Sequence, residues 1–143
     1  MFFTRRDDKI EALRHVPLFE ALSKRDLNLV AKHADEVECE PGEVLVRQGA
    51  LGQEFVLIIE GQAKVERDGK VLAHVGGGDF FGEMALLDGK GRSATVTVEK
   101  PSKLLVIPSR SFNTLLDEVP GLQRKMLVTL SERIRELQKT VVG

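Results

Sequence analysis

Residues 76–98 read GGGDFFGEMALLDGKGRSATVTV, with three consecutive glycines, an apolar EMALL run, and one arginine followed by small residues. Glycine lets the backbone approach another group closely, and arginine binds anions. After a strand, Gly82 would begin a short helical turn whose first N–H groups can bind an anion. The DGKG loop would then bring Arg92 back over those groups. These residues predict a two-sided clamp for one phosphate.

The same stretch also admits a purely structural interpretation. It could form an ordinary corner of a β-roll, with Glu83 and Arg92 in a surface salt bridge. A Gly-rich loop alone is a weak signal for phosphate binding, so the residues by themselves leave both interpretations open. In the phosphate interpretation, Glu83 could accept a hydrogen bond from a sugar hydroxyl, and the small Ser93 and Ala94 would let the backbone come close.

Composition excludes several classes of protein. The 143 residues fit one compact domain, and a hydrophobic content of 42% is enough to fill a core. The formal net charge of -1 gives no general attraction to nucleic acid or to an anionic membrane, so neither is expected as a partner. Cys39 is the only cysteine, which excludes an intrachain disulfide and suits a reducing cytoplasm. We find no signal peptide and no apolar run of membrane-spanning length.

Residues 1–36 are expected to be helical. Ser23 followed by Asp26 resembles the capped start of a helix. The apolar residues after it recur at helical spacing: Leu27, Val30, Ala31 and Ala34.

Residues 37–108 change to the short apolar runs of β-strands, separated by turns. Asp68-Gly69 between alternating residues is a strong hairpin signal. Strands this short and regularly spaced indicate a small antiparallel roll or barrel. The predicted fold class is α+β: an antiparallel, jelly-roll-like β-roll flanked by N-terminal helices and a C-terminal helical lid.

Residues 109–143 are expected to form two helices, the first capped by Ser109 or Ser111. The second helix carries apolar residues at alternating spacings of three and four: Leu127, Leu130, Ile134, Leu137 and Val141. We call these five residues the heptad seam, since their spacing suits a contact between two helices. The seam packs either on the roll of its own chain or in a homodimer through residues 121–141.

The ordered set PGE, RQG, FVLIIEGQAKV and GGGDFFGEMALLDGKGRSATV resembles the cyclic nucleotide-binding domain family. The resemblance extends from VPLFEALSKRDL to the final helix, and its FGE-x-A-L-L and R-small-A-T motifs are more specific than a lone glycine pattern. It implies a single domain over residues 1–143, with a phosphate-binding cassette at residues 80–95. It also implies a sensor that is not an enzyme, with no cofactor and with cAMP, or less strongly cGMP, as ligand.

The resemblance implies a role for each matching position of the cassette. The backbone N–H groups of Gly82 and Ala85 resemble those that meet the phosphate. Glu83 matches the carboxylate that binds the ribose 2′-hydroxyl, and Arg92 matches the arginine that pairs with the cyclic phosphate. Ser93 lies where the family has a small or hydroxyl residue, and serine there is compatible with cAMP.

Other implied contacts lie outside the cassette. Val65, Leu72 and Ala73 would wall the base, and Leu86 resembles an apolar hinge contact with the following helices. Arg133 aligns with a helix position that faces the pocket, where it either pairs with Glu83 or stays solvated. The candidate ligand-binding residues are Val65, Leu72, Ala73, Phe81, Gly82, Glu83, Met84, Ala85, Arg92, Ser93, Ala94 and Arg133.

Other functions have weaker support. His15, His33 and His74 fall on different predicted elements, so no metal site is expected, and no GxSxG nucleophile motif occurs. A second hypothesis is a domain of the same fold that pairs through its C-terminal helix without binding nucleotide. The presence of both Glu83 and Arg92 favours the sensor. The length leaves no room for an effector module, so we expect either a stand-alone sensor or a fragment.

Overall fold

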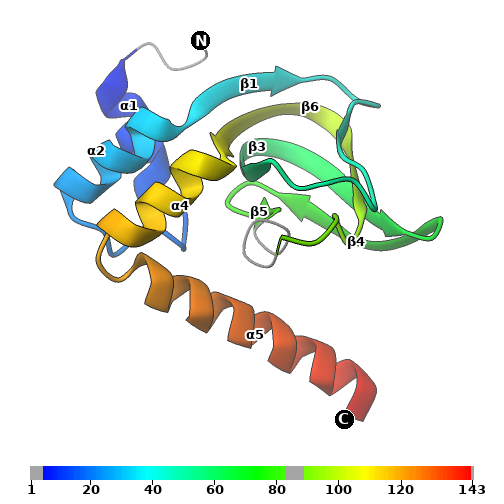
Figure 1. Cartoon of the computed structure of the whole chain (residues 1–143). Helices are drawn as coiled ribbons and strands as arrows, with labels where there is room; N and C mark the ends of the chain where they lie inside the picture. The colour runs from blue at the N-terminus through cyan, green and yellow to red at the C-terminus, as the bar shows by residue number, and fades with distance from the viewer. Residues whose placement is uncertain (1–4, 83–88, 143) are drawn as a thin grey trace.

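The computed structural model describes residues 5–82 and 89–142, which form a group of helices beside an antiparallel β-roll (Figure 1). The helices of this part of the chain are α1 (Arg6–Arg14), α2 (Lys24–His33), α4 (Ser109–Glu118) and α5 (Leu122–Val142). Its strands are β1 (Asp35–Cys39), β2 (Val44–Val46), β3 (Glu54–Arg67), β4 (Lys70–Gly76), β5 (Phe80–Phe81) and β6 (Thr95–Pro108). The predicted α+β architecture is confirmed.

Two long strands, β3 and β6, organise the roll. They pair antiparallel from Glu54 opposite Pro108 to Glu66 opposite Thr95, and the sheet continues in the order β1-β6-β3-β4. The short strands attach at the ends of this pair, with β2 on β6 and β5 on β3. Register shifts along β3 bend the strands, as irregular pairing does in curled sheets.

The hairpin between β3 and β4 is the one predicted at Asp68-Gly69. Arg67 pairs with Lys70, and the φ angles of Asp68 and Gly69 are 53° and 79°. Two consecutive positive φ angles in a two-residue loop are typical of a type I′ turn, whose twist matches that of the strands it joins. The hairpin prediction is confirmed.

The helix caps agree with the sequence in one place and differ in another. The backbone N–H of Asp26 donates to Ser23 Oγ at 3.1 Å, as predicted for the start of α2. The prediction that Ser109 or Ser111 caps α4 is wrong, because Pro108 is the N-cap residue and no side chain caps the helix. The N–H of Ser109 instead donates to the carbonyl oxygen of Gln53 at 2.8 Å. The strand β6 therefore runs directly into α4.

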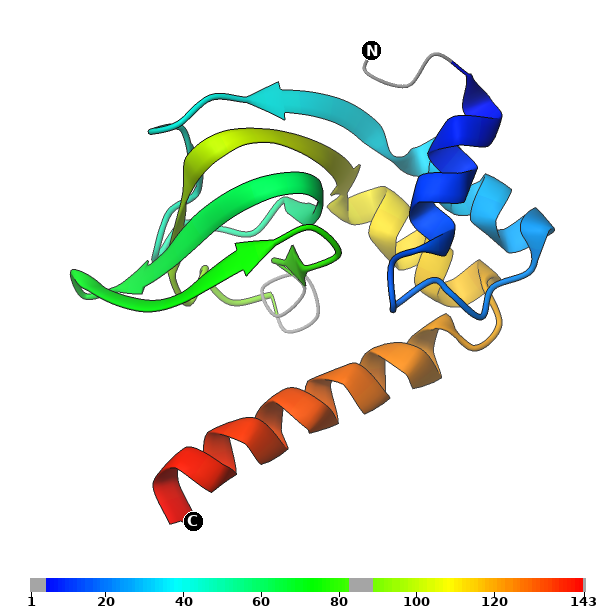
Figure 2. The same ribbon diagram turned by 180° about the vertical axis from the view of Figure 1, so that it is seen from behind.

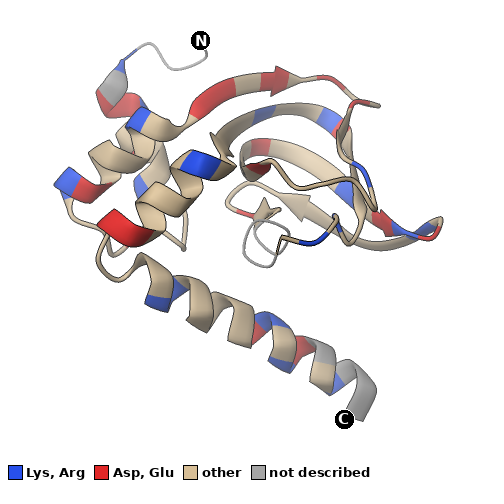
Figure 3. Cartoon of the chain, viewed as in Figure 1, with Lys and Arg blue, Asp and Glu red and all other residues tan. Residues whose placement is uncertain are grey.

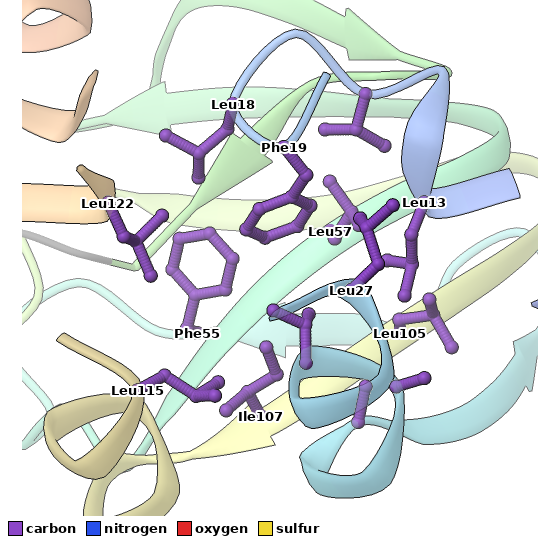
Figure 4. Packing of buried hydrophobic residues seen from close by; sticks show 14 of the residues in the cluster. Leu13, Leu18, Phe19, Leu27, Phe55, Leu57, Leu105, Ile107, Leu115 and Leu122 are labelled. Carbon is purple, nitrogen blue, oxygen red and sulfur yellow. The ribbon is translucent and has the colours of Figure 1, made fainter. Parts of the chain in front are cut away.

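One hydrophobic core joins the helices to the roll (Figure 4). Phe55 of β3 is fully buried at its centre, with ring centroids 5.3 Å from Phe80 and 4.9 Å from Phe112. Leu122 and Met126 bury the first turns of α5 in the same core. A second cluster fills the interior of the roll: Cys39, Val56, Ile58, Ala63, Val96, Val98, Leu104 and Val106.

The helix α5 leaves the helical group and passes beside the roll on the side of β5, as the two opposite views show (Figures 1 and 2). Beyond its first turns, α5 exposes Leu127 and Ile134 of the heptad seam, at 65% and 55% of their surface. Its intramolecular packing therefore uses Leu122 and Met126 rather than these two residues. Within the described residues, no helix combines the length and apolar character needed to span a membrane.

The strand β1 lies at one edge of the sheet and carries acidic side chains along its length (Figure 3). Asp35 and Glu38 are exposed there. An exposed strand edge can pair with another chain, and charges along it oppose such pairing. The sequence of β1 therefore protects an edge that the topology leaves open.

Cys39 provides a test of the roll interior. Burial, followed by a hydrogen bond and charge repulsion from Glu43, raises the pKa of its thiol from 9.0 to about 11. The folded state therefore holds the thiol proton more strongly than the unfolded chain does. The resulting stability is fully present below pH 9.0 and is lost as the pH rises through about 11.

We expect iodoacetamide to alkylate Cys39 far more slowly in the native protein than in urea at about pH 8.5, near the pKa of a free thiol. Mass spectrometry of timed aliquots measures both rates. Cys39→Ala should reduce the loss of unfolding free energy between pH 9.0 and about 11. Equal alkylation rates in the two states would contradict the buried position.

Candidate ligand-binding site

The main chain of Arg92 is held by the turn that precedes β3. The N–H of Gly49 donates to the carbonyl oxygen of Arg92 at 2.8 Å. The N–H of Arg92 donates to the carbonyl oxygen of Ala50 at 2.7 Å. A neighbouring bridge pairs Leu51 with Gly91. A Cβ at Gly91 would lie 2.8 Å from the carbonyl oxygen of Gly49, so the two segments approach as closely as glycine allows. These contacts with residues 49–51 thus fix the position of the Arg92 main chain, from which its side chain extends.

The Arg92 side chain points at Gly82, the last described residue before position 89. It is only 7% exposed, and its guanidinium donates from Nη1 to the carbonyl oxygen of Gly82 at 2.9 Å and from Nη2 to that of Glu54 at 2.7 Å. A buried cation needs such partners, because burial otherwise costs the loss of its hydration. One side chain therefore joins the end of β5, the start of β3 and the segment before β6.

Gly82 meets a steric requirement at this junction. Its φ is +96°, and a Cβ there would lie 2.5 Å from Arg92 Nη1 and 2.7 Å from the carbonyl oxygen of Glu54. Both the backbone conformation and the space exclude a side chain. The absence of a side chain at Gly82, a residue of the predicted cassette, is therefore what permits Arg92 to pack against it.

A cavity of about 390 Å³ opens beside this junction. Small-molecule sites usually occupy about 300–1,000 Å³ and combine apolar walls with a few polar groups. Gly82, Arg92 and Ser93 contribute polar groups to its lining, and one valine from each of β2, β3, β4 and β6 contributes apolar surface. The lining residues are Val46, Val65, His74, Val75, Asp79, Phe80, Phe81, Gly82, Arg92, Ser93, Ala94, Val96 and Arg133. The cavity therefore offers both an anion-binding group and an apolar wall.

The structure brings together a majority of the predicted site residues. Those that line the cavity are Val65, Phe81, Gly82, Arg92, Ser93, Ala94 and Arg133. Glu83, Met84 and Ala85, together with the predicted hinge residue Leu86, lie outside the described residues.

Leu72 and Ala73, predicted to wall the base, are not among the lining residues. The pairing of β3 with β4 shifts there, because Val65 is opposite Ala73 and Glu66 is opposite Val71. This shift leaves Leu72 as the extra residue of a bulge, with 53% of its surface exposed. A bulge depends on cross-strand pairing, which the sequence of β4 alone does not reveal.

Val75 is a lining residue that the sequence analysis missed. Val75 is opposite Ala63, and Ala63 is two residues from Val65 on β3. Because alternate residues of a strand share a face, Val75 and Val65 lie on the same face of the sheet. The sequence signal for Val75 was the alternation of β4, because Val75 lies two residues after the predicted Ala73 and therefore on the same face. Five further lining residues were also missed: Val46, His74, Asp79, Phe80 and Val96.

The side chain of His74, one of the lining residues, contacts Glu99. Its Nδ1 lies 2.7 Å from Glu99 Oε1, and Gln62 Nε2 donates to the same oxygen at 3.1 Å. The bond from His74 is the main cause that lowers the pKa of the Glu99 carboxyl below its ordinary value, despite the opposing effect of burial. A metal site on the three histidines was not expected, and no group of three metal-binding side chains occurs among residues 5–82 and 89–142.

Arg133 connects α5 to the rim of the cavity. Its guanidinium carbon lies 4.3 Å from the centroid of the Phe80 ring, and Nη2 donates to the carbonyl oxygen of Phe80 at 3.1 Å. A guanidinium over an aromatic face is held by the charge distribution of the ring. Arg133 therefore contacts β5 while it remains exposed to solvent. Its predicted pairing with Glu83 lies outside the described residues.

A family model and sequence relatives assign the chain to the same family. The family model described as "Cyclic nucleotide-binding domain" matches residues 36–119, more than half of the chain. A cAMP-dependent protein kinase regulatory subunit of Schizosaccharomyces pombe is 35% identical over 113 residues, which are 78% of this chain and 27% of the relative. One from Colletotrichum orbiculare is 32% identical over 125 residues, which are 86% of this chain and 32% of the relative. The chain thus spans about a third or less of the length of these curated relatives.

Solved structures agree with the sequence relatives. The structure described as "cAMP bound PfPKA-R (141-441)" matches with a TM-score of 0.83 and 26% identity, over 95% of this chain and 47% of that one. The catabolite activator protein of Thermus thermophilus matches with a TM-score of 0.79 and 28% identity, over 87% of this chain and 61% of that one. Regulatory domains of this kind bind ligands and are not enzymes. The chain therefore belongs to the cyclic nucleotide-binding domain family and is a cyclic nucleotide-binding regulatory domain.

Proposed function

We propose that this domain senses cAMP, or less strongly cGMP, and passes the binding event to its C-terminal helices. The observation that carries the proposal is the hydrogen bond from Arg92 to Gly82, two residues that both line a cavity of about 390 Å³. Relatives of the same fold include structures described as bound to cAMP. The single negative charge of a cyclic phosphodiester suits one buried guanidinium.

The ligand would lie with its cyclic phosphate at the polar groups of the cavity lining and its base on the valines. Arg92 and Ser93 would contact the phosphate together with main-chain N–H groups that follow Gly82. The roles of Glu83 at the ribose 2′-hydroxyl, and of Leu72 and Ala73 at the base, remain predictions from the resemblance. Ser93 is compatible with either nucleotide, so the preference for cAMP rests on the resemblance and on the cAMP-bound relatives.

Coupling to the helices would use the contacts that α5 makes with the helical core and with β5. Leu122 and Met126 anchor its first turns in the helical core, and Arg133 holds its middle against β5 at the rim. A ligand can shift this helix only if it binds one helix arrangement better than another. A nucleotide contacting both the cassette and the Arg133 region would have that property.

The exposed part of the heptad seam supports a homodimer through α5. Leu127 and Ile134 are large apolar side chains that the domain itself leaves uncovered. A second copy would bury both. The lone cysteine of the chain suits the cytoplasm as the compartment of this sensor.

Arg92→Ala tests the phosphate contact. We expect it to weaken cAMP binding by about 2–4 kcal/mol, or about 30- to 1,000-fold in Kd, because the phosphate would lose its charged partner. Isothermal titration calorimetry gives the Kd, and Arg110→Ala on the exposed surface of α4 is the control for loss of one positive charge. Since Arg92 also binds two carbonyl groups, Arg92→Lys and the ligand-free melting temperature separate weakened binding from unfolding. Unchanged affinity in folded Arg92→Ala would refute the clamp.

A thermal-shift comparison with cAMP and cGMP separates the sensor from the nucleotide-independent alternative. A binder gains stability once the ligand concentration exceeds its Kd, and the better ligand gives the larger shift at equal concentration. No shift with either nucleotide, in a protein that still forms dimers, would support the alternative.

Gly82→Ala tests the close approach at the cassette. We expect a loss of unfolding free energy of about 1–2 kcal/mol from the positive φ, and about 1–3 kcal/mol more from the contact with Arg92. Gly89→Ala is the matched control, because Gly89 has a φ of +71° and a Cβ there meets nothing within 4 Å. Urea unfolding measures both variants. Equal losses would show that Arg92 does not require the glycine.

Ile134→Asp tests the dimer. A charge in the seam would have to be buried in the proposed interface, so the variant should sediment as a monomer under conditions where the wild type is dimeric. Val128→Asp is the control, since Val128 is also exposed but lies about 100° around the helix from Leu127. A monomeric wild type, or equal effects of both substitutions, would contradict pairing through the seam.

A further inference from the structure

A polar cluster outside the cavity joins three segments that are far apart in sequence. The N–H of Gln48 donates to Thr95 Oγ1 at 2.9 Å, at the start of β6. The side chain of Gln48 reaches the β3–β4 turn, where Nε2 donates to Asp68 Oδ1 at 2.9 Å. Its Oε1 accepts from the N–H of Asp68 at 3.0 Å. Gln48 thus binds both the side chain and the backbone of one turn residue.

A second bond ties the same hairpin to the cassette. Arg67, next to the turn, donates from Nε to the carbonyl oxygen of Ser93 at 2.9 Å. We call Gln48, Arg67 and Asp68 the hairpin clasp. None of the three lines the cavity.

The hairpin clasp holds the chain on both sides of Arg92. From one side, Gln48 leads directly into Gly49 and Ala50, which exchange backbone hydrogen bonds with Arg92. From the other, Arg67 fixes the carbonyl of Ser93, the next residue along. The direction of the Arg92 side chain toward Gly82 depends on where this backbone lies.

We propose that the hairpin clasp positions Arg92 for the phosphate, so that the β3–β4 turn acts as a part of the binding site that never touches the ligand. The inference rests on the proposed function. A group that binds an anion works best when its own supports hold it in place before the ligand arrives, because ordering it on binding costs affinity. Gln48, Arg67 and Asp68 are therefore positioning residues.

Three variants of the Gln48–Asp68 pair test the proposal. Gln48→Glu sets two carboxylates against each other. Adding Asp68→Asn to it restores a donor and an acceptor with their places exchanged, and asparagine tolerates the positive φ. Asp68→Gly removes the carboxylate without backbone strain.

We expect Gln48→Glu and Asp68→Gly each to raise the Kd for cAMP by about 3- to 10-fold, the effect of one or two lost hydrogen bonds. The double variant should return to within about 2-fold of the wild type. If only the charge near the site mattered, the two single variants would change the Kd in opposite directions, because Gln48→Glu adds a negative charge and Asp68→Gly removes one. Asn113→Asp on α4 is the control for an added charge far from the cluster.

Arg67→Lys keeps the positive charge but loses the Nε–H donor, and it should weaken binding in the same range, whereas Lys70→Ala should not. The nitrogen-15 NMR signal of Arg92 Nε–Hε in ligand-free protein reports its position independently of stability. It should shift in each broken variant and return in the double variant.

Opposite effects of the two single changes, or no rescue, overturn the inference while cAMP binding by the wild type leaves the proposed function intact. Failure of the wild type to bind either nucleotide overturns both.

Discussion

The guanidinium of Arg92 is almost completely buried, and the arrangement of the cassette follows from how that charge is accommodated. The guanidinium donates hydrogen bonds to the main-chain oxygens of Gly82 and Glu54, which come from segments that are far apart in the sequence. Satisfying the charge therefore fixes the end of β5 against the start of β3. It also requires a glycine at position 82, because any side chain would occupy the space of the guanidinium. The cavity opens at this junction, so the residue that stabilises the corner is also the residue an entering anion would meet.

The helix α5 contacts both the other helices and the β-roll. Its first turns belong to the helical core, and Arg133 places its middle on Phe80 of the roll. Phe80 stacks on Phe55, and Phe55 stacks on Phe112 of α4. A continuous line of ring contacts thus runs from the cavity rim to the helix that precedes α5. This contact is the physical connection on which the proposed coupling would depend.

Features governed by short stretches of chain were predictable. Asp68-Gly69 makes the hairpin because few residues tolerate two positive φ angles, and Ser23 caps α2 because its hydroxyl reaches an N–H three residues away. The motifs around Gly82 and Arg92 also placed both residues in one site. The predicted serine cap of α4 was wrong because a distant segment decides that helix start. The N–H of Ser109 donates to the carbonyl oxygen of Gln53, which is remote in the sequence.

By itself, the amino-acid sequence determined the family and the roll between two groups of helices, and it predicted the buried arginine that lines the cavity. These rest on local conformational preferences and on an ordered motif. Only the tertiary structure decided that Leu72 sits in a bulge while Val75 lines the cavity, that Arg133 packs on Phe80, and that Gln48 reaches Asp68. Each of these depends on the register of paired strands or on the approach of distant segments. Those are set by the packing of the whole chain, which no window of sequence contains.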